Sequence, residues 1–372
     1  MDYAEFTDFA KVMFKSGLPF LVEGEPGIGK TALIERATKE LKMDLIVTHP
    51  AVRSPIDYGG VPAQTRPASG NKPAEWDFVP VGDLRKLVGA KRPTVFFMDD
   101  FGHGTTATQN ATCHLIHARQ IGENMISDNV RICAATNRAS DKAGVNPTLE
   151  NVKSRFRSIV KLNPDVDGWL NWAFNCEDVG LLDKVEPMPA VLPAFISWKR
   201  DMLFDFKPKP GLENSRSPRT IHHVGQMLAA GAVTDTTAFE VISRATDKGF
   251  AVEFLAFLKL WSHLPDPEDV LKDPDILDDM TFERYVYDEN KGKVVSSGQS
   301  PISMRPDVAF ALVTSTVDIV KTRQMSNFVS LLSKFAKPVE VLGMLLIQQK
   351  NPACMETRAF IQWAETNQSY LI

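Results

Sequence analysis

One short segment near the start of the chain limits the fold more than any other. It reads Gly24, Glu25, Pro26, Gly27, Ile28, Gly29, Lys30 and Thr31, which matches G-x-x-x-x-G-K-[ST] at every fixed position. An apolar run at residues 19–23 precedes it and a helical pattern follows it. This strand, loop and helix context argues against a chance glycine-rich turn. The segment therefore predicts a loop between a buried strand and the start of a helix.

These residue types are suited to binding phosphate groups. Glycines let backbone N–H groups wrap around phosphate oxygens, and the positive end of the following helix adds attraction. Lys30 is placed to neutralise the outer phosphates, and Thr31 is placed to bind magnesium. We therefore expect this loop to bind ATP together with Mg²⁺.

The first half of the chain predicts an α/β fold. Five mostly apolar runs are expected to be strands: 19–23, 44–48, 94–98, 130–135 and 158–162. Continuous apolar runs are typical of parallel strands that are buried on both faces. Leu33, Ile34, Ala37 and Leu41 recur at helical spacing, and a second helix is expected at about 106–118. We predict a parallel five-stranded sheet with helices on its faces.

The third apolar run ends in two acidic residues, Asp99 and Asp100. A phosphate-loop enzyme needs an acid at such a strand end to hold magnesium. Asp99 is the candidate for that role, and Asp100 is the candidate for orienting or activating the attacking water. The alternative is that the pair only forms a turn. The phosphate loop in the same chain makes this alternative less favoured.

Two further polar residues are candidates that depend on the motifs above. Asn137 ends the fourth run, where its amide could contact the γ-phosphate or the attacking water. Arg155 lies just before the fifth run and could reach the nucleotide of a neighbouring subunit. The plainer interpretations are a turn at Asn137 and Arg138, and a solvated basic turn around Arg155.

Insertions and proline-rich breaks divide the rest of the chain. Residues 54–80, with Trp76 and Phe78, predict an ordered functional loop, and residues 119–130 predict a hairpin. After Pro164 the pattern changes to helices separated by prolines, and strand-like runs become scarce. The expected domains are an α/β core at 1–164, an α-helical lid at 165–265 and an α-helical C-terminal extension at 266–372.

Composition and charge exclude several classes of protein. Hydrophobic residues make up 44% of the 372 and charged residues 24%, which excludes a largely disordered chain. A net charge of −4 gives no general attraction to nucleic acid or anionic lipid. No apolar run approaches the length of a membrane span and no signal-peptide pattern is present, so we expect a cytoplasmic protein. The four cysteines are far apart, which argues against a disulfide framework.

Three other patterns carry less favoured hypotheses. A metal site at Cys113, His114 and His117 lacks a carboxylate or further ligand nearby. The segment 137–141 differs by one residue in spacing from the guanine-reading N-K-x-D pattern, so ATP is favoured over GTP. A solvated face is expected for the basic residues Lys199, Arg200, Lys207 and Lys209.

Taken together, these motifs resemble the AAA+ ATPases, and within them the MoxR-like branch that includes the CbbQ and NorQ-type and phage-associated members. By this resemblance residues 24–31 correspond to Walker A, Asp99 and Asp100 to Walker B, and Asn137 to sensor 1. The resemblance likewise implies that Arg155, within Ser-Arg-Phe, is an arginine finger.

The resemblance extends into the second half of the chain. Ser217-Pro-Arg219-Thr resembles sensor 2, which implies that Arg219 contacts the γ-phosphate of its own subunit from a lid helix. The segment 166–173, with two tryptophans, resembles the lid entry of phage-associated members, and its alternative interpretation is a simple amphipathic helix. The insertions at 54–80 and 119–130 correspond to the helix-2 insert and pre-sensor-1 hairpin, which face the central pore of a ring.

One residue departs from the family pattern. Most members have Glu where this chain has Asp100, and the missing methylene withdraws the carboxylate from the water by about 1.5 Å. We therefore expect slow hydrolysis by an enzyme that is nevertheless active.

The resemblance implies a ring-forming ATPase, a hexamer of identical subunits, that moves pore elements against a partner protein. In MoxR-like systems that partner often contains a von Willebrand factor A domain, and the sequence does not identify the client. One alternative is an AAA+ module that acts on nucleic acid, since the Ser-Arg-Cys finger of clamp loaders is similar to residues 154–156. The other is a slow-hydrolysing nucleotide switch.

Overall fold

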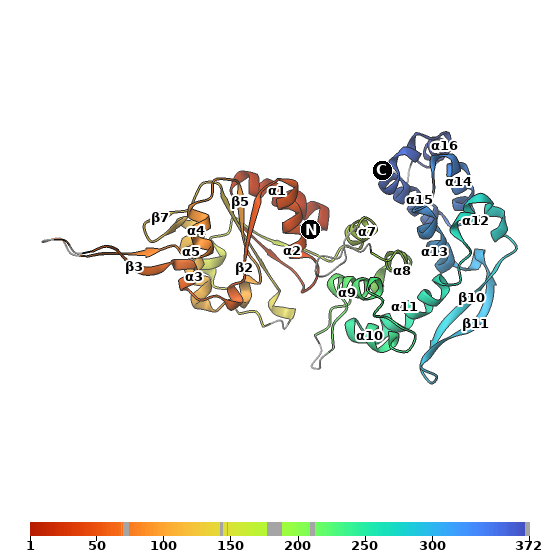
Figure 1. Ribbon diagram of the computed structural model, residues 1–372, viewed down its shortest axis with the longest axis horizontal. Helices are drawn as coiled ribbons and strands as arrows, with labels where there is room; N and C mark the ends of the chain where they lie inside the picture. The colour runs from red at the N-terminus through yellow and green to blue at the C-terminus, as the bar shows by residue number, and fades with distance from the viewer. Residues whose placement is uncertain are drawn as a thin grey trace. The chain divides into compact units, whose positions relative to one another are not determined.

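The computed structural model describes residues 1–67, 69, 74–141, 144–146, 148–176, 188–208 and 213–368. Lys209 of the basic segment and residues 68 and 70–73 of the first insertion lie outside this described part. The chain divides into two units, which are considered one at a time (Figure 1). The first comprises Met1–Gly168 with Phe206–Pro208, and the second comprises Trp169–Asp205 with Lys209–Ile372.

A five-stranded parallel sheet forms the centre of the first unit. Its spatial order is β2 (Asp44–Thr48), β5 (Thr94–Met98), β8 (Val130–Thr136), β1 (Phe20–Glu23) and β9 (Ser158–Lys161). In the register of β1, Phe20 lies opposite Cys133 of β8 on one side and Ser158 of β9 on the other. Two predicted strands agree with the structure at both ends and the other three differ by one residue. The predicted α/β fold with a parallel five-stranded sheet is confirmed.

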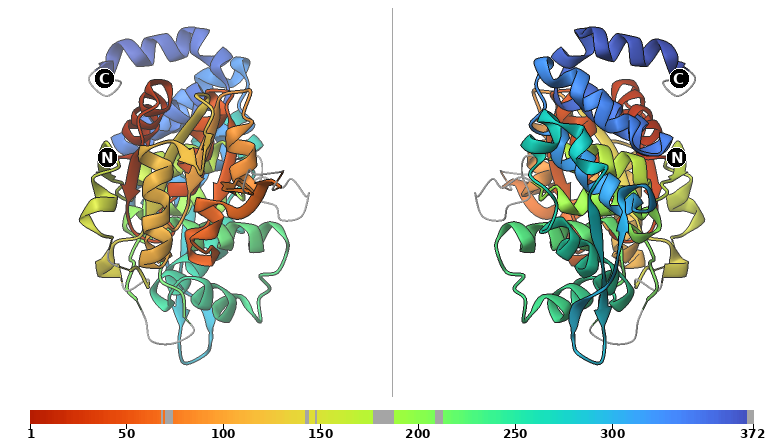
Figure 2. Two further views of the ribbon diagram at one scale, coloured as in Figure 1. Left: turned by 90° about the vertical axis from the view of Figure 1, so that its left-hand side faces the viewer. Right: turned by 90° about the vertical axis from the view of Figure 1, so that its right-hand side faces the viewer.

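Helices cover both faces of this sheet (Figures 1 and 2). On one side lie α1 (Tyr3–Ser16) and α2 (Lys30–Glu40), and on the other lie α4 (Asp83–Val88) and α5 (Thr106–His117). Along β1, Leu21 belongs to the core cluster with α4 and α5, whereas Phe20 packs against Phe9 and Phe14 of α1. The short helix α6 (Glu150–Lys153) precedes β9. Strand β1, which has apolar side chains on both faces, is therefore covered by helices on both faces.

The sequence does not predict α1, although its two ends carry clear local signals. Asp2 and Glu5 form a capping box at its start, and Gly17 ends it in the left-handed conformation. Phe6, Phe9 and Phe14 surround the ring of Phe20 with centroid distances of 6.3, 5.3 and 5.6 Å. These contacts tie α1 to β1, the strand that precedes the phosphate loop.

Both insertions contain antiparallel hairpins. The first holds α3 (Ile56–Gly59) and the pair β3 (Val61–Arg66) and β4 (Glu75–Val79), which extends away from the sheet (Figure 1). Trp76 is 68% exposed and Phe78 is 51% exposed on this hairpin. The second insertion forms the short pair β6 (Gln120–Ile121) and β7 (Asn124–Met125), as predicted.

The second unit is mainly helical, as predicted. Proline occupies the first turn of α9, α12, α13 and α15, where its missing N–H has no helical acceptor to lose. The helices from the unit boundary onward are α7 (Val166–Phe174), α8 (Val191–Trp198), α9 (Pro218–Ala229), α10 (Ala238–Ala245), α11 (Lys248–Trp261), α12 (Pro267–Lys272), α13 (Pro306–Val317), α14 (Met325–Ser333), α15 (Lys337–Lys350) and α16 (Arg358–Thr366).

One hairpin in this unit is not predicted by the sequence. Strands β10 (Thr281–Asp288) and β11 (Lys293–Pro301) pair in antiparallel fashion beside α11. The ring of Tyr287 stacks on Phe239 at 4.5 Å, and the buried Arg305 donates to the carbonyl of Phe282. The hairpin is stabilised by these distant contacts, and its strands are too polar to stand out as apolar runs.

Within the described residues no helix is both long and apolar enough to span a bilayer.

The aromatic cluster at Phe20 yields a stability prediction. Phe6→Ala removes a fully buried ring and should lower the free energy of unfolding by about 3–5 kcal/mol. Urea unfolding followed by circular dichroism measures the change. Val12→Ala, on the same helix but 60% exposed, is the control and should change it by less than about 0.5 kcal/mol. Equal effects of the two substitutions would contradict the packing described.

Candidate functional site

The loop between β1 and α2 has a backbone that only glycine accommodates at several positions. A Cβ on Gly24 would lie 2.6 Å from the side chain of Ile28 and 2.9 Å from the carbonyl oxygen of Leu162. Gly27 and Gly29 have φ of 78° and 99°, in the region that side chains disfavour. The loop therefore curls closely over the end of β1 and delivers Lys30 to the first turn of α2.

Lys30 lies at the centre of this loop and is buried. Its Nζ donates to the carbonyl oxygens of Gly24 at 2.9 Å and Glu25 at 2.8 Å, and to Asn137 Oδ1 at 2.8 Å. Asn137 reaches this point because β8 pairs with β1 in parallel, with Thr136 opposite Glu23. The structure thus brings together two of the residues that the sequence singles out, 107 positions apart in the chain.

A second pair of predicted residues meets one strand further along. Thr31 Oγ1 donates to Asp99 Oδ2 at 2.6 Å, and the other oxygen of Asp99 accepts from the backbone N–H of Asp100 at 2.9 Å. A hydroxyl beside a buried carboxylate provides the hard oxygen ligands that Mg²⁺ takes. Burial, together with the charge on Asp99, raises the pKa of Glu35 on α2. The residues present therefore fit a magnesium ion held by Thr31 and Asp99.

Asp100 has an uncommon backbone conformation. Its φ of 52° and ψ of 38° lie in the left-handed region, where Asp is several times more frequent than most residues. The chain then enters the short 3-10 helix Phe101–His103, and Gly102 approaches Thr136 so closely that a Cβ would lie 2.3 Å from its hydroxyl. The Asp100 carboxylate is 48% exposed and lies 3.7 Å from His103 Nδ1. It is thus accessible to water at the carboxyl edge of the sheet.

The sequence does not predict an ion-pair network beside Lys30. The guanidinium of Arg138 lies 2.7 Å from Glu25 Oε1 and 2.8 Å from Asp141 Oδ1, and both carboxylates are buried. The hydrogen bond to Asp141 is the main cause that raises the pKa of Arg138. Arg138 therefore links the phosphate loop to the turn after β8. No spacing rule identifies it, because Glu25 and Arg138 are distant in sequence.

Tyr3 is a second residue that sequence reasoning does not identify. Its hydroxyl donates to the carbonyl oxygen of Ile28 in the loop at 2.6 Å, and burial raises the pKa of that hydroxyl. Its backbone N–H donates to Asp165 Oδ2 at 3.1 Å. Helix α1 thus supports the phosphate loop from outside.

Comparison with known proteins gives partial similarities. No family model matches the sequence, and no curated protein matches it. Among solved structures, the chain is similar to a RuvB mutant from Thermotoga maritima with 16% identity and a TM-score of 0.38, covering 72% of this chain and 73% of that one. The Thermotoga maritima RuvB Holliday junction branch migration motor has 15% identity and a TM-score of 0.34, covering 73% and 74%. NtrX from Brucella abortus has 10% identity and a TM-score of 0.37, covering 66% and 52%.

The strand order decides the form of the core. Numbered along the chain as core strands one to five, the sheet reads 2-3-4-1-5, all parallel, with the phosphate loop after strand 1. The acid pair follows strand 3 and Asn137 follows strand 4. The first unit has the α/β architecture of a P-loop core, with the phosphate loop following the first core strand. A mainly helical second unit follows this core in the chain.

Arg155 lies in the first unit but makes no hydrogen bond or ion pair to Lys30, Asp99 or Asn137 within the described residues. The backbone N–H of Arg157 donates to the carbonyl of Pro19 at 2.7 Å, so this segment lies where β1 begins, whereas the phosphate loop lies where β1 ends. Arg155 is partly exposed, and its buried Nε has no hydrogen-bond partner in the described part of the chain.

Arg219 lies in the second unit, on the exposed side of the first turn of α9. Ser217 and Thr220 form a capping box on either side of it. Burial lowers the pKa of His223, one turn further on, and the charge of Arg219 acts in the same direction. Its predicted contact with a γ-phosphate stays a prediction.

The less favoured hypotheses gain no support. Among the residues that the structure describes, no group of three His, Cys, Asp or Glu side chains could hold a metal ion, so Cys113, His114 and His117 form no such site. Lys199 of the basic segment pairs with Glu253 at 2.7 Å, which reduces the positive charge of that segment.

The Arg138 network yields a test by a double-mutant cycle. Arg138→Met should destabilise the protein because it leaves two buried carboxylates without their cation. Glu25→Gln should relieve part of that loss, so we expect a coupling free energy of about 1–2 kcal/mol between the two changes. Urea unfolding of the two single variants, the double variant and the native protein measures it. Strictly additive effects would show that the pair does not interact.

Proposed function

We propose that this chain is a magnesium-dependent ATPase of the AAA+ type that works as a subunit of a ring and remodels a partner protein. One observation carries the catalytic part of the proposal. The ammonium of Lys30 lies among the oxygens of Gly24, Glu25 and Asn137, and Thr31 and Asp99 pair directly beside it. Residues from three strand ends converge there on one cation and one pair of oxygen ligands.

The residues around Lys30 divide the work of phosphate binding. Gly24, Gly27 and Gly29 free the backbone to approach phosphate oxygens, and Lys30 would exchange its carbonyl partners for those oxygens. Thr31 and Asp99 would hold Mg²⁺, which neutralises phosphate charge when bound. The Arg138 link keeps Glu25, and with it the loop, in place.

Water activation falls to residues at the carboxyl edge of the sheet. Asp100 is exposed enough to accept a hydrogen bond from a water and orient it toward the phosphate. Asn137 would share its amide between Lys30 and the phosphate. Because Asp100 has a short side chain, we expect modest turnover.

The position of Arg155 supports a ring. Its segment lies at the end of the sheet where β1 begins, away from the phosphate loop of its own chain. A partly exposed guanidinium with an unpartnered Nε is suited to serving the nucleotide of an adjacent subunit. We propose a homo-oligomeric ring, a hexamer, in which Arg155 completes the neighbouring site and Arg219 senses the nucleotide in its own subunit.

The surface of the first insertion supports a protein as the partner. Trp76 and Phe78 are largely exposed on the β3–β4 hairpin, and aromatic side chains are enriched at protein interfaces. A net charge of −4 does not favour a nucleic-acid backbone. We propose a client protein of the kind that MoxR-like ATPases engage, with a von Willebrand factor A domain protein as the partner.

Phosphate release from ATP by the purified protein tests the catalytic proposal. Lys30→Ala should reduce the rate at least about a hundredfold, because it removes charge stabilisation of the phosphates. Asp100→Glu should raise the rate about tenfold, because it advances the carboxylate toward the water, whereas Asp100→Asn should lower it. If ATP binds but neither the native protein nor any of the variants releases phosphate, the nucleotide switch is favoured. Stimulation by DNA that is lost at high salt would favour the nucleic-acid alternative.

Mixing two inactive variants tests whether Arg155 acts between subunits. Arg155→Ala and Lys30→Ala should each be inactive alone, and an equimolar mixture should regain roughly a quarter of the native rate, the fraction of interfaces with both parts intact in a closed ring. The rate is measured as phosphate release after the subunits exchange. Native activity of Arg155→Ala alone, or no recovery despite proven exchange, would exclude action in trans.

A further inference from the structure

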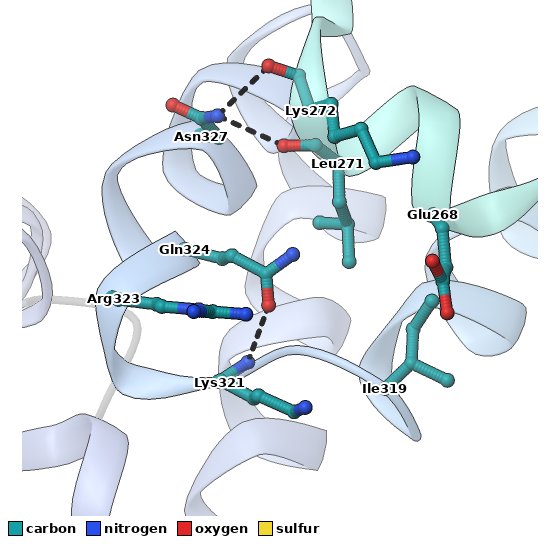
Figure 3. Close-up of a pocket in the computed structure, with 8 residues that line it drawn as sticks. All are labelled: Glu268, Leu271, Lys272, Ile319, Lys321, Arg323, Gln324 and Asn327. Atoms are coloured by element: carbon teal, nitrogen blue, oxygen red, sulfur yellow. Dashed lines mark hydrogen bonds between the residues drawn. The ribbon is translucent and has the colours of Figure 1, made fainter.

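A concave site in the second unit is separate from the residues considered so far. It is a cavity of about 380 Å³ between the end of α12, the segment after α13 and the start of α14 (Figure 3). That size lies within the range of sites for small molecules, which is about 300–1,000 Å³. The side chains that line it are Glu268, Leu271, Lys272, Ile319, Lys321, Arg323, Gln324 and Asn327.

Hydrogen bonds fix both walls of this cavity. Asn327 of α14 donates both hydrogens of its amide to the carbonyls of Leu271 and Lys272, at 2.9 and 3.0 Å, and so holds the end of α12. Gln324 Oε1 accepts from the backbone N–H of Lys321 at 3.2 Å and fixes the turn Thr322–Gln324 (Figure 3). The backbone of both walls is therefore held in place without a ligand, while the charged side chains of Glu268, Lys321 and Arg323 are exposed to solvent at the opening.

The charges around the cavity are mostly positive. Lys321 and Arg323 lie across the opening from one carboxylate, that of Glu268, and Lys272 lies on the same helix as Glu268 (Figure 3). Lys272 pairs with Asp269 at 2.9 Å, but within the described part of the chain neither Lys321 nor Arg323 forms an ion pair. Helix α14 begins at this wall without a side-chain cap, so the positive end of its dipole adds to the same potential. An anion is the complementary ligand.

The lining also indicates what kind of molecule carries the anion. Arg323 presents a planar fork that matches phosphate oxygens, with the charge of Lys321 beside it. On the opposite side Glu268 lies beside the apolar side chain of Ile319 (Figure 3). A carboxylate there accepts from a hydroxyl or amine and repels a second anionic group. The site therefore suits a phosphate at one end and a neutral, hydroxyl-bearing body at the other.

The surrounding charge argues against an extended polyanion. Residues 265–279 contain seven acidic side chains and a single lysine, Lys272. A nucleic-acid strand requires a continuous row of cations along its backbone, and this acidic segment interrupts any such row. A compact phosphomonoester places its charge only at Lys321 and Arg323.

We propose that the cavity between α12 and α14 binds the phosphate group of a small phosphomonoester through Lys321 and Arg323, with Glu268 accepting a hydrogen bond from a hydroxyl of the same molecule. This site is independent of the phosphate loop, and its test does not rely on ATP hydrolysis.

The experiment uses isothermal titration calorimetry of the full chain with ribose 5-phosphate, in a Lys30→Ala background that disables the phosphate loop. The double change Lys321→Ala and Arg323→Ala should weaken binding at least about tenfold, because it removes the charge-assisted hydrogen bonds. The charge-matched control, Arg284→Ala with Lys293→Ala on the β10–β11 hairpin, should leave the affinity unchanged. Thermal unfolding verifies that all variants are folded.

A single change separates this proposal from generic charge attraction. Glu268→Gln should weaken the binding of ribose 5-phosphate and strengthen the binding of inorganic phosphate. The carboxylate accepts a hydrogen bond from the sugar but repels a free phosphate ion. Absence of ribose 5-phosphate binding, or equal losses in the pocket and control variants, would overturn the proposal. Binding of a twelve-nucleotide single strand that is lost in the pocket variant, without ribose 5-phosphate binding, would instead assign the site to a polynucleotide.

Discussion

The first unit depends on one buried ammonium group. Lys30 is buried, and its Nζ donates to three oxygens, two from the loop and one from Asn137, which offset the cost of removing an ammonium group from water. The oxygen of Asn137 is in reach because the strand before the loop and the strand before Asn137 are neighbours in parallel register. The strand order, the loop glycines and the Asn137 amide therefore all contribute to surrounding the Lys30 ammonium group with oxygens.

Supports outside the motifs hold this arrangement in place. Tyr3 donates to the loop from one side, and Arg138 connects the loop to the turn after β8 from the other. Each support satisfies a buried polar group, Ile28 O or the Glu25 carboxylate, that would otherwise be costly to remove from water. The phosphate loop is therefore stabilised by two elements of the core that a motif search does not include.

The sequence predicts the strands of the core well where both faces of a strand are buried. A strand covered on both faces, such as Thr94–Met98, is almost entirely apolar, so its ends are visible as changes in composition. The β10–β11 hairpin is invisible by the same criterion, because its polar strands depend on Phe239, Arg305 and α11 for support. Likewise, the motif residues are found by spacing, whereas the Glu25 and Arg138 pair depends on a fold that brings distant carboxylates and cations together.

The left-handed backbone at Asp100 gives a physical reason for an aspartate rather than a glutamate at this position. Asp tolerates positive φ because its short side chain bonds locally to the backbone, whereas Glu has no such compensation and would bear strain of about 1 kcal/mol or more there. The turn into Phe101–His103 thus favours the shorter acid, even though the longer one reaches further toward a water. Backbone conformation at this residue and the reach that the proposed water activation requires therefore favour acids of different length.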